Sequence, residues 1–123
     1  MNNKNLNNQS ALSKEEVDSV MRLYSSGKFN EAIATIKSLN ENYPNVPLLF
    51  NILGACYKSQ GQLEKSIQMF EKAVKIKPDY AEAYNNLGIT FLKLHILFQG
   101  RWQYATYYHD TNHYRILHML VKK

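Results

Sequence analysis

The chain repeats itself at an interval of thirty-four residues, and this period limits the folds that it can adopt. Residues of one kind recur in register: the sets are Leu23, Tyr57 and Phe91; Gly27 and Gly61, with His95 in the third place; and Pro44 and Pro78. A period near this length is typical of stacked helical hairpins, each too thin to bury its own apolar face. The sequence therefore predicts an all-α solenoid, with its core between neighbouring hairpins.

The second repeat, residues 47–80, shows how each hairpin is specified. Apolar residues recur at helical spacing on both sides of Gly61, which tolerates the positive φ of a tight turn. Pro78 has no N–H to continue a helix and biases Lys77 away from the helical region. The pattern predicts five helices, over residues 13–26, 29–42, 47–60, 63–76 and 81–94.

These positions resemble the signature of the tetratricopeptide repeat (TPR) family, which is a large aromatic, Leu-Gly, Tyr, then an aromatic, Ala and Pro. It is carried by Phe50, Leu53-Gly54, Tyr57, Phe70, Ala73 and Pro78, and again by Tyr84, Leu87-Gly88 and Phe91. The first repeat has Ser19-Val20 in place of Leu-Gly, as expected of an N-terminal cap with one side in water. The resemblance implies a right-handed superhelix of about two and a half repeats.

The expected organisation has five parts. They are a disordered, Asn-rich tail (1–12), a degenerate capping repeat (13–46), a second repeat (47–80), the first helix of a third (81–94) and a C-terminal segment (95–123). Ser13 and Glu16 have the spacing of a capping box at the first helix. The last segment contains all the histidines and the single Trp102. It is either a divergent closing helix or a segment unrelated to the repeat, from truncation or a shifted reading frame.

Charge and composition weaken several classes of function. Residues 1–94 carry eleven basic and nine acidic side chains, a balance of +2 within a net charge of +5, so the repeats lack the basic stripe that nucleic-acid binding requires. No apolar run approaches the roughly 18 residues that span a bilayer. Cys56 is the only cysteine, which favours a reducing, cytoplasmic location and a thiol used in packing.

Chemistry-bearing patterns are absent or weak. The sequence contains no Gly-rich phosphate loop, nucleophile with a base or paired-carboxylate site, so we expect neither catalysis nor a cofactor. His109 and His113 are four residues apart, but the Glu of a zinc hydrolase helix is missing between them. We therefore expect surface histidines and no metal site.

A binding surface is expected on the concave side of the superhelix, where the first helices present a side not used in packing. Counting i, i+4, i+7 along them gives the partner-binding candidates Tyr24, Asn51, Ala55, Lys58, Asn85, Asn86, Ile89 and Lys93, next to Val17, Met21 and Leu92. Asn51 and Asn85 are equivalent, and paired amides can bind the backbone of an extended peptide. The run 81–88 resembles the superhelix of protein O-GlcNAc transferases, where the resemblance implies an asparagine ladder; alternatively, these amides only solvate a helix.

Two classes of function follow from this reading. The first is an interaction module that binds a protein or an extended peptide on the concave face, with weak pairing of two chains through the open C-terminal end. The second is the N-terminal TPR portion of a larger enzyme, such as a glycosyltransferase or sulfotransferase.

Overall fold

The computed structural model describes residues 11–97, and within them the fold is all-α. The helices are α2 (Lys14–Ser25), α3 (Phe29–Asn42), α4 (Pro47–Ser59), α5 (Leu63–Ile76) and α6 (Ala81–Leu97). The predicted all-α solenoid is confirmed, and the first four helices begin and end within one residue of their expected positions. The predictions for the N-terminal tail (1–12) and for the C-terminal segment (95–123) lie outside the described residues, apart from positions 11 and 12 and 95–97.

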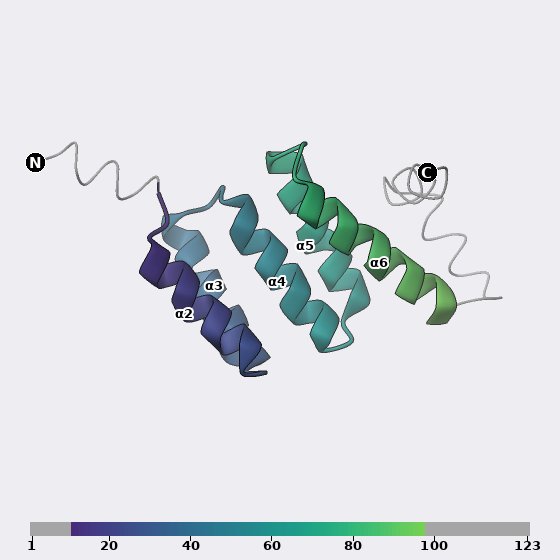
Figure 1. Cartoon of the computed structure of the whole chain (residues 1–123), viewed down its shortest axis with the longest axis horizontal. Helices are drawn as coiled ribbons and strands as arrows, with labels where there is room; N and C mark the ends of the chain where they lie inside the picture. Colours follow the sequence, from purple (N-terminus) through teal and green to yellow (C-terminus); the bar gives the residue numbers. More distant parts are fainter. Residues whose placement is uncertain (1–10, 98–123) are drawn as a thin grey trace, which may run out of the picture.

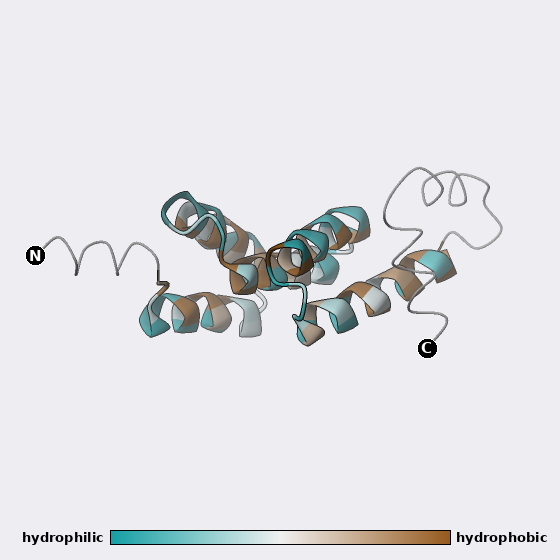
Figure 2. Ribbon diagram, turned by 90° about the horizontal axis from the view of Figure 1, so that it is seen from above, coloured by the Kyte–Doolittle hydropathy of each residue, from teal (hydrophilic) through white to brown (hydrophobic). Residues whose placement is uncertain are grey.

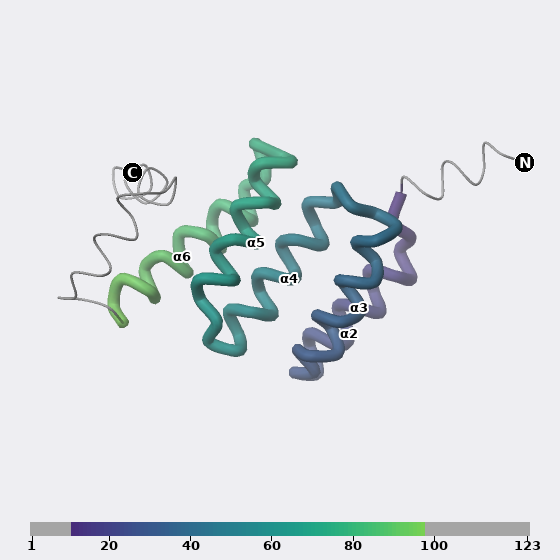
Figure 3. The backbone as a smooth tube through the Cα atoms, turned by 180° about the vertical axis from the view of Figure 1, so that it is seen from behind, coloured from purple at the N-terminus to yellow at the C-terminus, as the bar shows by residue number. Residues whose placement is uncertain are grey.

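The helices form two layers of antiparallel hairpins. In Figure 1 the nearer layer contains α2, α4 and α6, and Figure 3, from behind, has α3 and α5 in front. The most extensive contacts join helices that follow one another along the chain, and α4 also contacts α6. Each helix is therefore held mainly by its neighbours in sequence, as in other repeat arrays.

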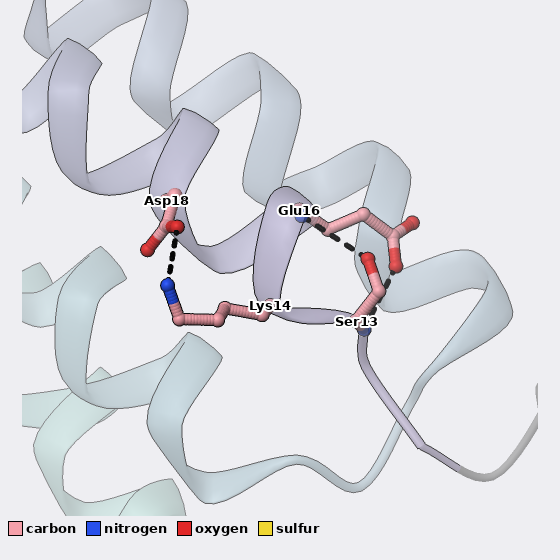
Figure 4. Close-up of polar contacts among 4 residues, drawn as sticks. All are labelled: Ser13, Lys14, Glu16 and Asp18. Carbon is pink, nitrogen blue, oxygen red and sulfur yellow. Dashed lines mark hydrogen bonds and ion pairs between the residues drawn. The ribbon is translucent and has the colours of Figure 1, made fainter.

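The first helix begins at the predicted capping box, shown in Figure 4. The Ser13 hydroxyl accepts from the backbone N–H of Glu16 at 3.1 Å, and the Glu16 carboxylate accepts from the backbone N–H of Ser13 at 3.0 Å. These bonds satisfy two donors that have no partner within the helix. They also favour the charged carboxylate, and the backbone bond from Ser13 is the largest of the causes that lower the pKa of Glu16.

Glycine closes the two complete hairpins, and its absence marks the third. Gly27 and Gly61 have φ of 75° and 78°, a conformation that costs an L-residue with a side chain about 1–2 kcal/mol. His95 occupies the corresponding place in the third repeat, yet it is helical, and α6 continues through Leu97. The predicted end of this helix at residue 94 is therefore wrong, because nothing at His95 favours a left-handed turn.

The core is built between the layers. Phe70 of α5 is fully buried and packs in a cluster with Leu63, Ile67, Leu87, Phe91 and Leu94. A second cluster joins α2, α3 and α4 around Val20, Ile36 and Leu49. Gly54 lets the helices approach, since a Cβ added there would lie 2.6 Å from Cε1 of Phe70. Figure 2 shows the central helix, α4, as largely apolar, because it contacts both neighbouring helices of the back layer.

Candidate functional site

The row of first helices carries the residues predicted to contact a partner. We call it the α2–α4–α6 face, and its members are Val17, Met21 and Tyr24 on α2, Asn51, Ala55 and Lys58 on α4, and Asn85, Asn86, Ile89, Leu92 and Lys93 on α6. Figure 2 shows α4 set back from α2 and from the beginning of α6, so the row is bent. Helix α6 contributes most of the exposed side chains and α4 the fewest.

Asn51 is used inside the fold, which corrects one expectation. Its side chain is only 4% exposed; Nδ2 donates to Oε1 of Glu82 at 3.1 Å, and Oδ1 accepts from Nδ2 of Asn86 at 3.0 Å. Tyr80 lies beside this group, and burial, followed by the charge of Glu82, raises the pKa of Tyr80 while the hydrogen bond to Asn51 opposes the shift. The predicted pair of free amides at Asn51 and Asn85 is therefore absent, because the first turns of α6 cover Asn51.

Glu82 is the partner that the sequence analysis missed. The equivalent position of the preceding repeat is Leu48, which is not acidic. A comparison of the two repeats therefore gives no sign that position 82 has a polar role. The carboxylate meets Asn51 only because two helices from different repeats pack side by side. This contact makes Asn51 part of the link between α4 and α6.

Helix α6 presents an exposed row of three different chemistries. Asn85, Ile89 and Lys93 follow one another at intervals of four residues, and all three side chains are exposed. Leu92 lies next to the row and is 55% exposed. Asn86 is half-buried and held by Asn51. The row therefore offers an amide, an apolar surface and a cation, one helical turn apart.

Two lysines lie toward the C-terminal ends of α4 and α6, at the other end of the face. Burial lowers the pKa of Lys58, and the positive charge of Lys93 lowers it further. Lys58 is half-buried in the last turn of α4, whereas Lys93 is exposed. Within residues 11–97 neither lysine has an acidic partner.

The remaining predicted positions are partly occupied by packing. Tyr24 is half-buried against the core cluster around Val20, Ile36 and Leu49, with its ring centroid 5.6 Å from that of Phe29 in an edge-to-face contact. Ala55 is half-buried against the cluster around Phe70. Of the three face residues on α2, Met21 is the exposed one. The face is therefore most accessible along α6.

The described residues show little that resembles reactive chemistry. Cys56 is buried, and burial raises the pKa of its thiol to about 11. Across residues 11–97 no three His, Cys, Asp or Glu side chains gather as metal ligands would. None of the five helices combines the length and apolar character that crossing a bilayer requires.

Comparison with known proteins identifies the repeat. The family model described as TPR repeat matches residues 54–94. The chloroplastic tetratricopeptide repeat domain-containing protein PYG7 of Arabidopsis thaliana is 44% identical over 45 residues, which cover 37% of this chain and 15% of that protein. The peroxisomal targeting signal receptor of Kluyveromyces lactis is 31% identical over 71 residues, 58% of this chain and 12% of the receptor.

A solved structure agrees with the fold. The TPR domain of Sgt2 from Aspergillus fumigatus superposes with a TM-score of 0.65 at 17% identity, over 94% of this chain and 82% of that domain. At this level of identity the likeness concerns the fold alone. The chain corresponds to less than a sixth of the length of the two sequence relatives, 15% and 12%.

Proposed function

We propose that this chain, which is a tetratricopeptide repeat protein, binds an extended segment of another protein on its α2–α4–α6 face. The observation that carries the proposal is the apolar surface that α6 exposes there, on Ile89 and Leu92. Exposed apolar side chains bordered by polar groups are typical of interaction sites. Here the polar groups are the Asn85 amide and the Lys93 ammonium.

The spacing of the α6 row suits an extended segment. Side chains four residues apart on a helix are separated by about 6 Å along its axis, at 1.5 Å per residue. Alternate side chains of an extended chain are about 6.6 Å apart and point to the same side. Consecutive inward side chains of a bound segment can therefore contact Asn85, Ile89 and Lys93 in turn.

The relatives support binding as the activity. One of them is named as the receptor of a peroxisomal targeting signal, although this chain matches only 12% of its length. The described residues also offer no activated nucleophile, since the Cys56 thiol is buried and its pKa is raised. We therefore propose that the array acts by binding and not by catalysis.

A matched pair of substitutions tests this proposal. A ligand is first selected from 12-residue random peptides displayed on phage, with the full chain as bait, and its affinity is measured by fluorescence anisotropy. Ile89→Asp places a charge on the α2–α4–α6 face, and Ile76→Asp is the control, because Ile76 is equally exposed (38% against 39%) but lies on α5 in the other layer. We expect the first variant to lose at least about tenfold in affinity and the second to bind like the wild type.

Circular dichroism would establish that both variants keep their helicity. Equal affinities of the two variants would place the binding surface elsewhere and refute the proposal. Weak pairing of two chains through the end of α6, a cytoplasmic location and the lack of nucleic-acid and membrane binding stay predictions. Sedimentation at several protein concentrations would test the pairing.

A further inference from the structure

The register between α4 and α6 brings Lys58 and Lys93 to the same part of the face. The two helices run in the same direction (Figure 1), and the Asn51–Asn86 hydrogen bond joins residues 35 positions apart. Lys58 and Lys93 are also 35 apart, and each lies seven residues, about two helical turns, beyond the bonded pair. Their proximity follows from the same packing that aligns the two asparagines.

Among residues 11–97, no acidic side chain pairs with the two lysines in this part of the face. The acidic side chain of α6, Glu82, is eleven residues before Lys93, about 16 Å along the helix axis, and is already hydrogen-bonded to Asn51. Lys58 is half-buried, and a lysine at such a position packs its stem on the protein while its ammonium group stays in water, where it is available to a partner. A carboxylate placed between the two ammonium groups would replace a repulsion with two attractive contacts.

From this arrangement, and resting on the proposed function, we infer that the Lys58–Lys93 pair binds an Asp or Glu side chain of the partner segment. We further infer that the segment carries an apolar residue two positions away, which packs on Ile89. Ile89 and Lys93 are one turn apart on α6, and this separation matches two residues of an extended chain. The preferred ligand therefore contains an acidic and an apolar residue separated by one residue.

Charge elsewhere favours a protein ligand over a nucleic acid. Residues 11–97 contain ten Lys and Arg and nine Asp and Glu, so no excess of positive charge extends across the array. The ammonium groups of Lys65, Lys72 and Lys77 lie over aromatic rings, at 5.6, 5.7 and 5.2 Å from the centroids. Lys65 and Lys72 belong to α5, in the other layer, and Lys77 caps that helix. Two lysines can neutralise one carboxylate but cannot follow a phosphate backbone.

A charge reversal on the full chain tests the inference. Peptides selected from the 12-residue library should show Asp or Glu two positions from Leu, Ile, Met or Phe. The double variant Lys58→Glu, Lys93→Glu should bind the selected peptide at least about tenfold more weakly than the wild type does. The same variant should prefer the analogue of that peptide that has Lys in place of the acidic residue. Lys65→Glu with Lys72→Glu, on the other layer, is the control and should change neither preference.

The outcomes separate the inference from the proposed function. If Ile89→Asp abolishes binding but charge reversal changes nothing, or if the selected peptides show no acidic preference, the inference is overturned and the binding face stands. If Ile89→Asp has no effect, both are refuted. Binding of a labelled single-stranded DNA probe that depends on the two lysines would also overturn the inference. If circular dichroism shows that the double variant is unfolded, the single variant Lys93→Gln, at an exposed position, is used instead. Its expected loss of affinity is smaller, about threefold.

Discussion

The contact between Gly54 and Phe70 determines how Gly54→Ala changes the free energy of unfolding, and we expect the sign of that change to depend on whether the Phe70 ring is present. A Cβ at position 54 would lie 2.6, 2.7 and 2.9 Å from three carbons of the Phe70 ring, closer than real Cβ contacts allow. The ring cannot easily move, because Phe70 is fully buried among Leu87, Phe91 and their neighbours. Gly54→Ala therefore changes both helix propensity and core packing, in opposite directions.

The magnitudes decide the expected sign. Alanine in the interior of α4 should stabilise the helix by about 1 kcal/mol relative to glycine, whereas overpacking a core costs about 1–3 kcal/mol. We expect Gly54→Ala to leave the free energy of unfolding unchanged or to lower it by up to about 2 kcal/mol. Phe70→Ala alone should cost about 3–5 kcal/mol, and once the ring is absent, Gly54→Ala should stabilise by about 1 kcal/mol.

Urea unfolding followed by circular dichroism measures the four free energies of this cycle. Phe70→Leu serves as the background if Phe70→Ala does not fold. Ile36→Ala is the control background, since Ile36 is equally buried but belongs to the other cluster, and there Gly54→Ala should remain neutral or unfavourable. If Gly54→Ala stabilises the wild type as much as the Phe70→Ala chain, the ring does not limit the approach of α4 and α5.

Two further predictions concern helix ends. Gly61→Ala should lower the free energy of unfolding by about 1–2 kcal/mol because φ is positive there, and not because of a clash, since nothing lies within 4 Å of the added Cβ. Gly61→Asn should cost less, because Asn adopts a positive φ more readily than Ala does. Equal melting temperatures for the two variants would contradict this prediction. The hydrogen bonds with Ser13 lower the pKa of the Glu16 carboxyl. The charged carboxylate therefore contributes to stability above its ordinary pKa of 4.5, and this contribution is lost as the pH falls through the folded-state pKa. The difference in melting temperature between wild type and Glu16→Gln should shrink below that pH, and a difference independent of pH would show that the carboxylate charge does not matter.

The fold could be predicted because its signals are local. Gly27 and Gly61 mark turns through their own backbone preferences, and the apolar spacing around Tyr57 needs only one helix to be recognised. The wrong prediction of where α6 ends also has a local cause. Position 95 is equivalent to Gly27 and Gly61, so a turn was expected there, but a histidine does not have the conformational freedom of a glycine. A repeat position indicates a turn only when its residue can make one.

The site was less predictable because its contacts join different repeats. Sequence comparison pairs Asn51 with Asn85, thirty-four residues on, whereas the structure pairs Asn51 with Asn86. Equivalent residues lie on the same side of their helices, and residues in contact must lie on sides that face each other. The burial of Asn51 and the approach of Lys58 to Lys93 both follow from that offset.

The buried cysteine makes local opening measurable in the unmodified chain. With a pKa of about 11, a fraction of only about one in ten thousand Cys56 thiols is ionised at pH 7, against about 3% for a thiol of ordinary pKa. A thiol reagent therefore reacts at a rate set by how often α4 separates from its neighbours. Because the chain has no other cysteine, that rate belongs to one position. A ligand that holds α4 in place slows the reaction, so binding can be followed without a label on either molecule.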